Sequence, residues 1–192
     1  MPTPNPAAFE FLQSRRSRPA KTLTAPVPDH ATLTELLRVA ARTPDHGKLE
    51  PWRFIVLEKQ ALSRLGSVIP DAGARLTIAP EKIEKAINQF ATADLAVAVV
   101  FSPKPSEKVP HIEQLYSAGA VCLALLNAAL ASGWGANWLS GWASHDPTFV
   151  QDNFGLKADE SIAGFIHIGT EKMAPPERPR PDIDAITTWV TS

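Results

Sequence analysis

The sequence predicts one globular domain in which helices cover both faces of a buried β-sheet. The clearest strand is Asp94–Phe101 (DLAVAVVF), whose uninterrupted apolar residues are typical of a strand that is buried on both faces. The longest helical pattern is His111–Ser132, and its second half, Ala118–Ala131, is apolar almost all round. Such a helix lies inside a large core or at a subunit interface. A chain of 192 residues can bury a core of this kind as a single domain, 1–192.

The other expected elements follow from apolar periodicity and from capping residues. A loose tail over residues 1–6 precedes a short helix, Ala7–Gln13, with Phe9 and Leu12 facing inward. Asp29 is expected to cap a helix that runs to Arg42. The remaining expectations are a strand at Phe54–Leu57, a helix at Lys59–Ile69, a loop at Pro70–Pro80, a helix with a solvated charged face at Glu81–Phe90, a helix at Pro147–Phe154 capped by Asp146, a strand at Ile162–Ile168, and a helix at Asp182–Val190 within a proline-rich C-terminal extension, 171–192.

Composition and charge exclude several classes of function. The formal net charge of −1 gives no overall electrostatic attraction to nucleic acid. The longest apolar stretch is interrupted by Asn127 and is shorter than the ~20 residues that a membrane span needs. The single cysteine, Cys122, lies in an apolar helical run and is expected to be a buried, unreactive thiol. The start of the chain lacks the features of a signal peptide, so we expect a cytoplasmic protein.

The first candidate binding segment is Ser14–Pro19 (SRRSRP), which places Arg15, Arg16 and Ser17 in consecutive positions. Guanidinium groups match phosphate oxygens in a two-pronged geometry, and a serine hydroxyl adds another donor. A phosphate site is one interpretation of this cluster. The other is a solvated basic turn.

The second candidate is Arg42–Phe54 (RTPDHGKLEPWRF), which joins a predicted helix to a predicted strand. Its prolines end the helix and restrict the backbone, so its charged groups stand on a preshaped connection. Loops on a rigid scaffold commonly carry binding residues. An ordinary solvated loop is the alternative.

The third candidate is Gly133–Trp142 (GWGANWLSGW), in which glycines and tryptophans alternate with small residues. Glycines allow close backbone approach and tryptophans provide flat apolar walls, which suits a planar ligand. A strand with bulky core residues fits equally well. The dinucleotide fingerprint G-x-G-x-x-G is absent. His167 is expected to be a satisfied core histidine, and neither His111 nor Glu113 has a partner at the spacing of metal ligands.

The order and spacing of these motifs resemble the FMN-dependent nitroreductase family, in its short, single-domain YdjA-like branch. The resemblance extends from about Ala8 to Trp189, and its most specific parts are RRSRP and the P-x-x-x-x-x-PWRF segment. It implies an α+β fold with a mixed, mostly antiparallel central sheet flanked by helices. It also implies a homodimer with FMN at the subunit interface.

The resemblance further implies which residues contact FMN. Arg15, Arg16 and Ser17 would hold the phosphate and ribityl chain, and the loop Pro44–Glu50 would reach the flavin of the other subunit. The full implied set is Arg15, Arg16, Ser17, Arg42, Pro44, His46, Lys48, Trp138, Leu139, Ser140, Arg178 and Arg180. Many members have Ser-Ser-x-Asn-x-Gln where this chain has Asp45–Glu50, and close relatives have arginine at the position of Leu139.

The activity implied is electron transfer from NAD(P)H through FMN to an electron-poor acceptor, such as a nitroaromatic or a quinone, in a ping-pong scheme. The flavin carries the chemistry, so no side chain is assigned as an acid–base catalyst. Lys48 is expected to place positive charge at the N1/O2 edge of the ring. The alternatives are a flavin-binding or storage protein without efficient turnover, or another FMN reaction of the same fold. An interaction module without flavin has little support.

Overall fold

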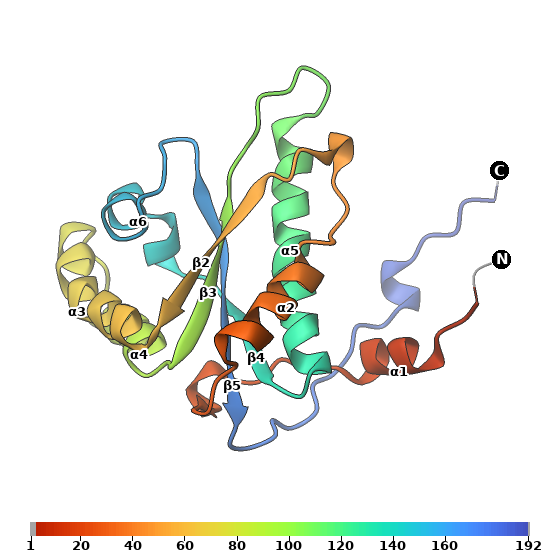
Figure 1. The fold of residues 1–192 in the computed structure, drawn as a ribbon, viewed down its shortest axis with the longest axis horizontal. Helices are drawn as coiled ribbons and strands as arrows, with labels where there is room; N and C mark the ends of the chain where they lie inside the picture. Colours follow the sequence, from red (N-terminus) through yellow and green to blue (C-terminus); the bar gives the residue numbers. More distant parts are fainter. Residues whose placement is uncertain (1–2, 192) are drawn as a thin grey trace.

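The computed structural model describes residues 3–191 and contains a central antiparallel sheet between two layers of helices (Figure 1). The strands are β1 (Leu23–Thr24), β2 (Trp52–Glu58), β3 (Leu95–Phe101), β4 (Gly135–Leu139) and β5 (Ser161–Glu171). The order in the sheet is β1-β5-β3-β2, and β4 also pairs with β5. All of these pairs are antiparallel, so the expected α+β fold is confirmed, whereas residues 3–191 contain no parallel pair that would make the sheet mixed.

Helices cover both faces of the sheet. They are α1 (Pro6–Ser14), α2 (His30–Ala40), α3 (Lys59–Arg75), α4 (Pro80–Ala91), α5 (His111–Ala131) and α6 (Pro147–Phe154), with 3-10 turns η1 (Ala20–Thr22), η2 (His46–Lys48), η3 (Trp142–His145) and η4 (Asp184–Ile186). Helices α2 and α5 contribute to the core on one face, and α3, α4 and α6 to the core on the other.

Strand β3 lies at the centre of both cores. All of its residues are buried, which confirms the prediction from its apolar sequence. Ala96 and Ala98 face α3 and α4, whereas Val97 and Val99 face α2 and α5. Successive side chains point to opposite faces of a strand, so an apolar residue is needed at every position.

Helix α5 is the central helix of its layer. It packs against α2 and against β3, β4 and β5. By length and composition alone it could cross a membrane, but about half of its apolar stretch is buried in this fold. The opposite side of the helix exposes a row of apolar side chains with a glycine at its centre. These residues are Ile112, Leu115, Tyr116, Gly119 and Leu123.

The expected loop at Pro70–Pro80 is wrong, because α3 continues through Pro70 to Arg75. A proline inside a helix removes one backbone hydrogen bond. Here the buried side chains of Ile69 and Ala72 hold the helix in the core, and α4 packs closely against Gly73. Tertiary burial therefore outweighs the local effect of the proline.

Two expectations at the chain ends are also wrong. Phe9 and Leu12 do not face inward but are exposed on α1. The expected helix at Asp182–Val190 is reduced to the short turn η4, and Trp189 is 86% exposed. Both ends project from the body of the domain (Figure 1), so their apolar residues have no core to pack against within one chain.

An ion pair between Arg53 on β2 and Glu160 before β5 ties the edge of the sheet to its centre. Arg53 donates from Nε and Nη2 to the two carboxylate oxygens of Glu160, at 2.8 and 2.7 Å. The Glu160 side chain is only 2% exposed and also accepts from the Lys157 backbone N–H. The guanidinium of Arg53 is the largest cause that lowers the pKa of Glu160, to about 2.

We predict that Glu160→Ala lowers the free energy of unfolding by about 2–4 kcal/mol at pH 7, because it removes one partner of a buried pair. The pKa of Glu160 is lower in the folded state, so its contribution is complete above the unfolded pKa near 4.5 and is lost as the pH falls towards 2. Urea unfolding at pH 7 and pH 3 measures this, and the difference between the two proteins should be smaller at pH 3 than at pH 7. The exposed pair of Glu35 with Arg38 provides the control, because Glu35→Ala should cost under about 0.5 kcal/mol. An equal loss for both variants at pH 7 would contradict the prediction.

Candidate functional site

The arginine segment before η1 is fixed against strand β4. The Arg18 backbone N–H donates to the Ala136 carbonyl at 2.8 Å, and the Asn137 side chain donates to the Arg18 carbonyl at 2.6 Å. Strand β4 is itself paired with β5 along its length. The strand interpretation of the Gly/Trp segment is thus confirmed for Gly135–Leu139, and this strand positions the N-terminal arginines.

Three arginines of this segment gather at the C-terminal end of α5. Arg15, Arg16 and Arg18 line a cavity of about 250 Å³ together with Leu130 and Trp134. Arg15 donates to the Ser17 hydroxyl at 3.1 Å. The basic segment is therefore partly buried in a cavity and is not a freely solvated turn.

The electrostatics of this cluster favour an anion. Burial, followed by the nearby charges of Arg180, Arg16 and Arg18, lowers the pKa of Arg15. Arg180 thus approaches the cluster from the C-terminal extension. Within residues 3–191, the Nε atoms of Arg15 and Arg16 are buried without a hydrogen-bond partner.

Two carboxylates offset part of the positive charge in the cluster. Glu171 pairs with Arg18 at 3.2 Å, and Glu177 pairs with Arg180 at 2.8 Å. Buried donors without acceptors are costly, and several guanidinium groups at one place repel each other. The donors that remain unpaired fit the oxygens of a phosphate group.

A larger cavity, of about 760 Å³, adjoins η1 on the α4 side of the sheet. Leu139 and Ser140, two of the residues that the family resemblance implies at the flavin, line it from the end of β4. Helix α4 contributes Lys85 and Gln89, and η1 contributes Lys21. The volume and mixed lining suit a planar, partly polar ligand.

Sequence reasoning missed the lysines of this cavity. The charged side of α4 is exposed, as expected for a solvated face, and part of it also lines the cavity through Glu84, Lys85 and Asn88. A charged helical face shows the same spacing of charges in the sequence whether it is freely solvated or lines a cavity. Only the packing of α4 next to η1 and β4 distinguishes them.

Trp138 lies on the opposite face of β4 from Leu139, because neighbouring residues alternate along a strand. Its indole ring crosses β5 above Gly164, where a Cβ atom would come within 2.0 Å of the ring nitrogen. Trp138 is 38% exposed and does not line the larger cavity. The structure thus separates Trp138 from Leu139 and Ser140, with which the sequence grouped it.

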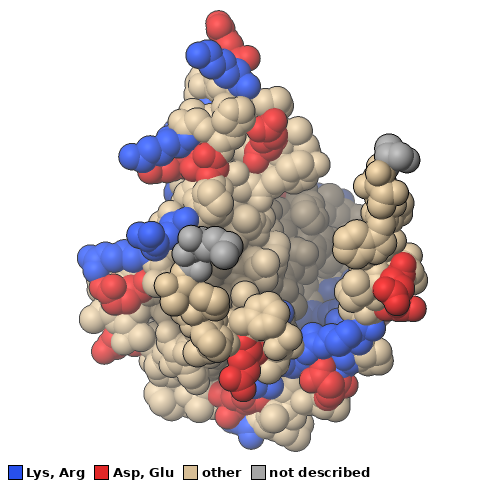
Figure 2. All heavy atoms as spheres, turned by 90° about the vertical axis from the view of Figure 1, so that its right-hand side faces the viewer, with Lys and Arg blue, Asp and Glu red and all other residues tan. Residues whose placement is uncertain are grey.

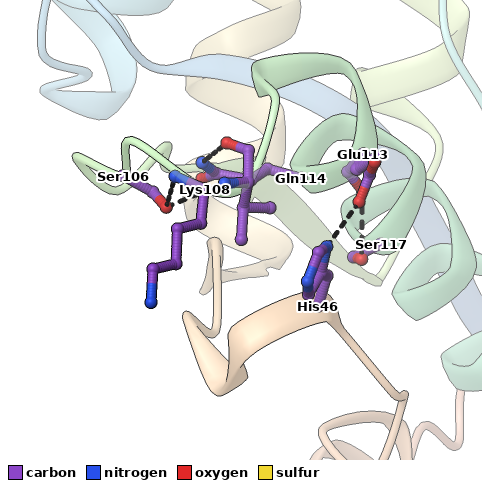
Figure 3. A network of polar contacts seen from close by, with 7 residues as sticks. His46, Ser106, Lys108, Glu113, Gln114 and Ser117 are labelled. Atoms are coloured by element: carbon purple, nitrogen blue, oxygen red, sulfur yellow. Dashed lines mark hydrogen bonds and ion pairs between the residues drawn. The ribbon is translucent and has the colours of Figure 1, made fainter.

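The loop Pro44–Glu50 lies at the other end of α5, beside its first turn. His46 Nδ1 and Glu113 Oε2 are 2.8 Å apart, and Figure 3 shows the imidazole pointing at this carboxylate. The loop is held in an unusual conformation, with positive φ at Gly47, Lys48 and Glu50. It is therefore a shaped connection, as its prolines predict.

The candidate residues consequently form two groups in one chain. Glu113, beside His46, and Leu130, beside the arginine cluster, lie roughly 25 Å apart along α5 at about 1.5 Å per residue. The loop residues Pro44, His46 and Lys48 are exposed in the first group, and Arg42 is exposed at the end of α2. Arg178 is exposed on the C-terminal extension. One chain does not bring both groups to a single ligand.

The other titratable candidates are core residues. Burial raises the pKa of the Cys122 thiol to about 12, which keeps it protonated and unreactive. Burial lowers the pKa of His167 to about 4, so its imidazole is neutral. His167 is a core residue as expected, but it is not satisfied: in the described chain neither ring nitrogen has a hydrogen-bond partner.

Comparison with known proteins gives the family. The family model described as "Nitroreductase family" matches residues 12–170. The chain belongs to the nitroreductase family. It is 35% identical to "Putative NAD(P)H nitroreductase YdjA" of Escherichia coli strain K12 over 166 residues, which cover 86% of this chain and 89% of that protein.

Solved structures of the nitroreductase family share the fold. A nitroreductase-like family protein from Bacillus cereus superposes with a TM-score of 0.79 and 22% identity, covering 99% of this chain and 98% of the other. A Desulfovibrio desulfuricans nitroreductase homologue, solved in complex with FMN, gives a TM-score of 0.75 and 18% identity, covering 99% and 100%. Both span the whole domain.

We predict that inorganic phosphate stabilises the ligand-free protein through the arginine cluster. At ten times its Kd, phosphate should raise the free energy of unfolding by about 1.4 kcal/mol, which thermal unfolding detects as a higher Tm. Arg15→Gln should abolish this gain. Arg38→Gln, which changes an exposed arginine on α2, should retain it. Equal stabilisation by chloride at the same ionic strength would contradict a specific site.

Proposed function

We propose that this protein is an FMN-dependent NAD(P)H oxidoreductase that acts as a cytoplasmic homodimer and reduces electron-poor acceptors such as nitroaromatics or quinones. The observation that carries the proposal is the buried, unpaired guanidinium donors of Arg15 and Arg16 close to a cavity large enough for a flat ring. Membership of the nitroreductase family supports it. So do the name of the E. coli relative and the FMN complex of the D. desulfuricans homologue.

The two cavities suit the two ends of FMN. In this proposal Arg15, Arg16 and Ser17 bind the phosphate, and Arg180 adds a further cation. The ring then lies towards Leu139 and Ser140 in the larger cavity. Arg18 and Asn137, which join the segment to β4, keep the two parts of the site at a fixed separation. When bound, FMN supplies the hydride transfer between NAD(P)H and the acceptor.

The protein's own task is binding, orientation and electrostatics. Lys21 and Lys85 line the larger cavity together with Glu81 and Glu84, and in this proposal the two lysines would stabilise the negative charge of a reduced ring held there. Lys48 of a second chain is the further candidate for this role. At an effective dielectric constant near 20, a cation at ~4 Å contributes roughly 4 kcal/mol before desolvation.

The exposed face of α5 supports a homodimer. Ile112, Leu115, Tyr116 and Leu123 form an apolar row on this helix, and Tyr116 is 67% exposed. Gly119, at the centre of the row, has open space above it and would allow close approach of a second helix. If two copies of α5 pack antiparallel about this point, the loop with His46 in one chain lies next to the arginine cluster of the other. The dimer thus completes a site that one chain leaves in two halves.

The exposed apolar residues at the two chain ends also favour a homodimer. The apolar side chains of Phe9, Leu12, Ile186 and Trp189 are exposed on segments that project from the domain. Figure 2 shows a hollow between the body and a projecting arm, lined mostly by uncharged side chains with Lys and Arg at its lower edge. A second copy seated there would bury these apolar groups.

We expect the purified protein to contain FMN, or to take it up when FMN is added, with flavin absorbance in the visible range. Anaerobic addition of NADH or NADPH should bleach this absorbance, and a nitroaromatic or quinone should restore it. Bound flavin that neither nicotinamide reduces would indicate a storage protein. A protein that binds no flavin would overturn the proposal altogether.

We predict that Leu123→Glu converts the dimer into a monomer, because it places an unpaired charge in the centre of an apolar interface, at a cost of several kcal/mol. Light scattering coupled to size exclusion measures the assembly, and FMN titration should show at least tenfold weaker binding. Leu76→Glu is the matched control, because Leu76 is a similarly exposed leucine at the end of α3. A dimeric Leu123→Glu protein with normal FMN affinity would exclude this interface.

A further inference from the structure

The Glu171 carboxylate, at the end of β5, lines the same cavity of about 250 Å³ as Arg15, Arg16 and Arg18. The sheet fixes its position, because Glu171 pairs with Leu23 of β1. Its Oε2 atom lies 3.2 Å from Arg18 Nε, and the side chains of Arg18 and Glu171 are 27% and 25% exposed. The cavity that we assign to a phosphate group therefore has a carboxylate in its wall.

The ion pair with Arg18 uses only one of the two carboxylate oxygens of Glu171. Within residues 3–191 the Oε1 atom is buried and has no hydrogen-bond partner. An ionised carboxylate accepts at both oxygens, and a buried acceptor without a partner costs free energy. Glu160 differs in this respect, because both of its oxygens accept from Arg53. Glu171 thus retains an acceptor that the fold of one chain does not use.

A phosphate group alone does not satisfy this acceptor. A phosphate ester carries close to two negative charges near neutral pH, so its oxygens accept hydrogen bonds and are repelled by a carboxylate. The unpaired Nε donors of Arg15 and Arg16 need an acceptor, whereas Glu171 Oε1 needs a donor. A ligand that satisfies all three atoms has an anionic group with a hydroxyl nearby. The cavity of about 250 Å³ equals the volume of roughly eight water molecules, which leaves room for both groups.

We propose that Glu171 is an FMN-binding residue that accepts a hydrogen bond from the ribityl hydroxyl next to the phosphate, while the arginines hold the phosphate itself. This role rests on the proposed FMN function, and it makes the arginine cavity specific for a phosphate ester of a polyol. The carboxylate repels every anion that enters the cavity, but it forms a hydrogen bond only with those that bring a hydroxyl. It therefore discriminates against inorganic phosphate and against esters without a neighbouring hydroxyl.

The test compares two phosphate esters of equal charge and equal carbon number. Glycerol 3-phosphate has a hydroxyl on the carbon next to the phosphate-bearing carbon, as the ribityl chain of FMN has, and n-propyl phosphate has none. Titration calorimetry of the FMN-free protein at pH 8, where both esters are dianions, gives the two Kd values. Because a hydrogen bond to a charged group is involved, glycerol 3-phosphate should bind about tenfold more tightly than n-propyl phosphate.

Two substitutions of Glu171 should reduce this preference in different degrees. Glu171→Gln keeps the size of the side chain and removes its charge, so it should bind n-propyl phosphate more tightly and lower the preference to about threefold or less. Glu171→Met removes both oxygens and should abolish the preference. A merely structural role would instead weaken the binding of both esters together.

FMN binding provides the second measurement, through quenching of flavin fluorescence. The ratio of the Kd for FMN to the Kd for n-propyl phosphate should rise about tenfold in Glu171→Met, because the hydroxyl contact is lost while the repulsion also disappears. Glu177→Gln is the matched control, since Glu177 pairs with Arg180 at 2.8 Å and is not among the residues that line the cavity. It should change the binding of FMN and of both esters alike and leave the preference unchanged.

The outcomes separate the role of Glu171 from the proposed function. Equal Kd values for the two esters in the unchanged protein would overturn the role, and so would a preference that persists in Glu171→Met. In either case FMN binding by the unchanged protein would leave the proposed function intact. A preference that depends on Glu171 in a protein that binds no FMN would refute the proposed function and leave Glu171 as the acceptor for another polyol phosphate. A protein that binds neither ester would overturn the role, because the cavity would not be a phosphate site.

Discussion

The packing of α5 against the sheet is the constraint on which the rest of the structure depends. One side of this helix is buried against β3, β4 and β5, and its two ends carry the two groups of candidate residues. Its C-terminal end meets the arginine segment, and its first turn holds His46 through Glu113. The length of the helix alone keeps these groups apart in one chain. The exposed apolar row on its other side provides the surface through which a second chain would reunite them.

Electrostatics support the proposal that the arginine cluster is a binding site and not only a feature of the fold. Hydrogen bonds fix the Arg18 backbone to β4, and Arg15 and Arg16 lie close to it in the same segment despite the repulsion between these charges. Glu171 and Glu177 offset part of this charge, and the buried Nε donors of Arg15 and Arg16 remain unpaired in the described chain. An arrangement that is unfavourable without a ligand becomes favourable when an anion enters. The same reasoning makes the strongly paired Arg53 and Glu160 a structural contact, because each satisfies the other.

Prediction from the sequence succeeded for the elements that have strong local patterns. It failed for elements whose conformation depends on contacts between residues far apart in the sequence. The apolar run of β3 and the helical periodicity of α5 can be recognised within a short continuous stretch of the sequence. The helix through Pro70 is not, because it depends on the burial of Ile69 and Ala72 against α4. Phe9 and Leu12 show the opposite error: their spacing is amphipathic, but one chain offers them nothing to pack against. Trp138 was grouped with Leu139 although strand alternation places them on opposite faces.

By itself the sequence determined the family, the order of the elements and the position of the arginine segment, since these are carried by residue types at short spacing. Tertiary structure alone decided that Lys21 and Lys85 share a cavity with Ser140, that Arg180 approaches Arg15, and that Glu113 holds His46. Each of these contacts joins residues far apart in the chain. Their proximity is set by how α4, α5 and the C-terminal extension pack around the sheet, and no local pattern encodes that packing.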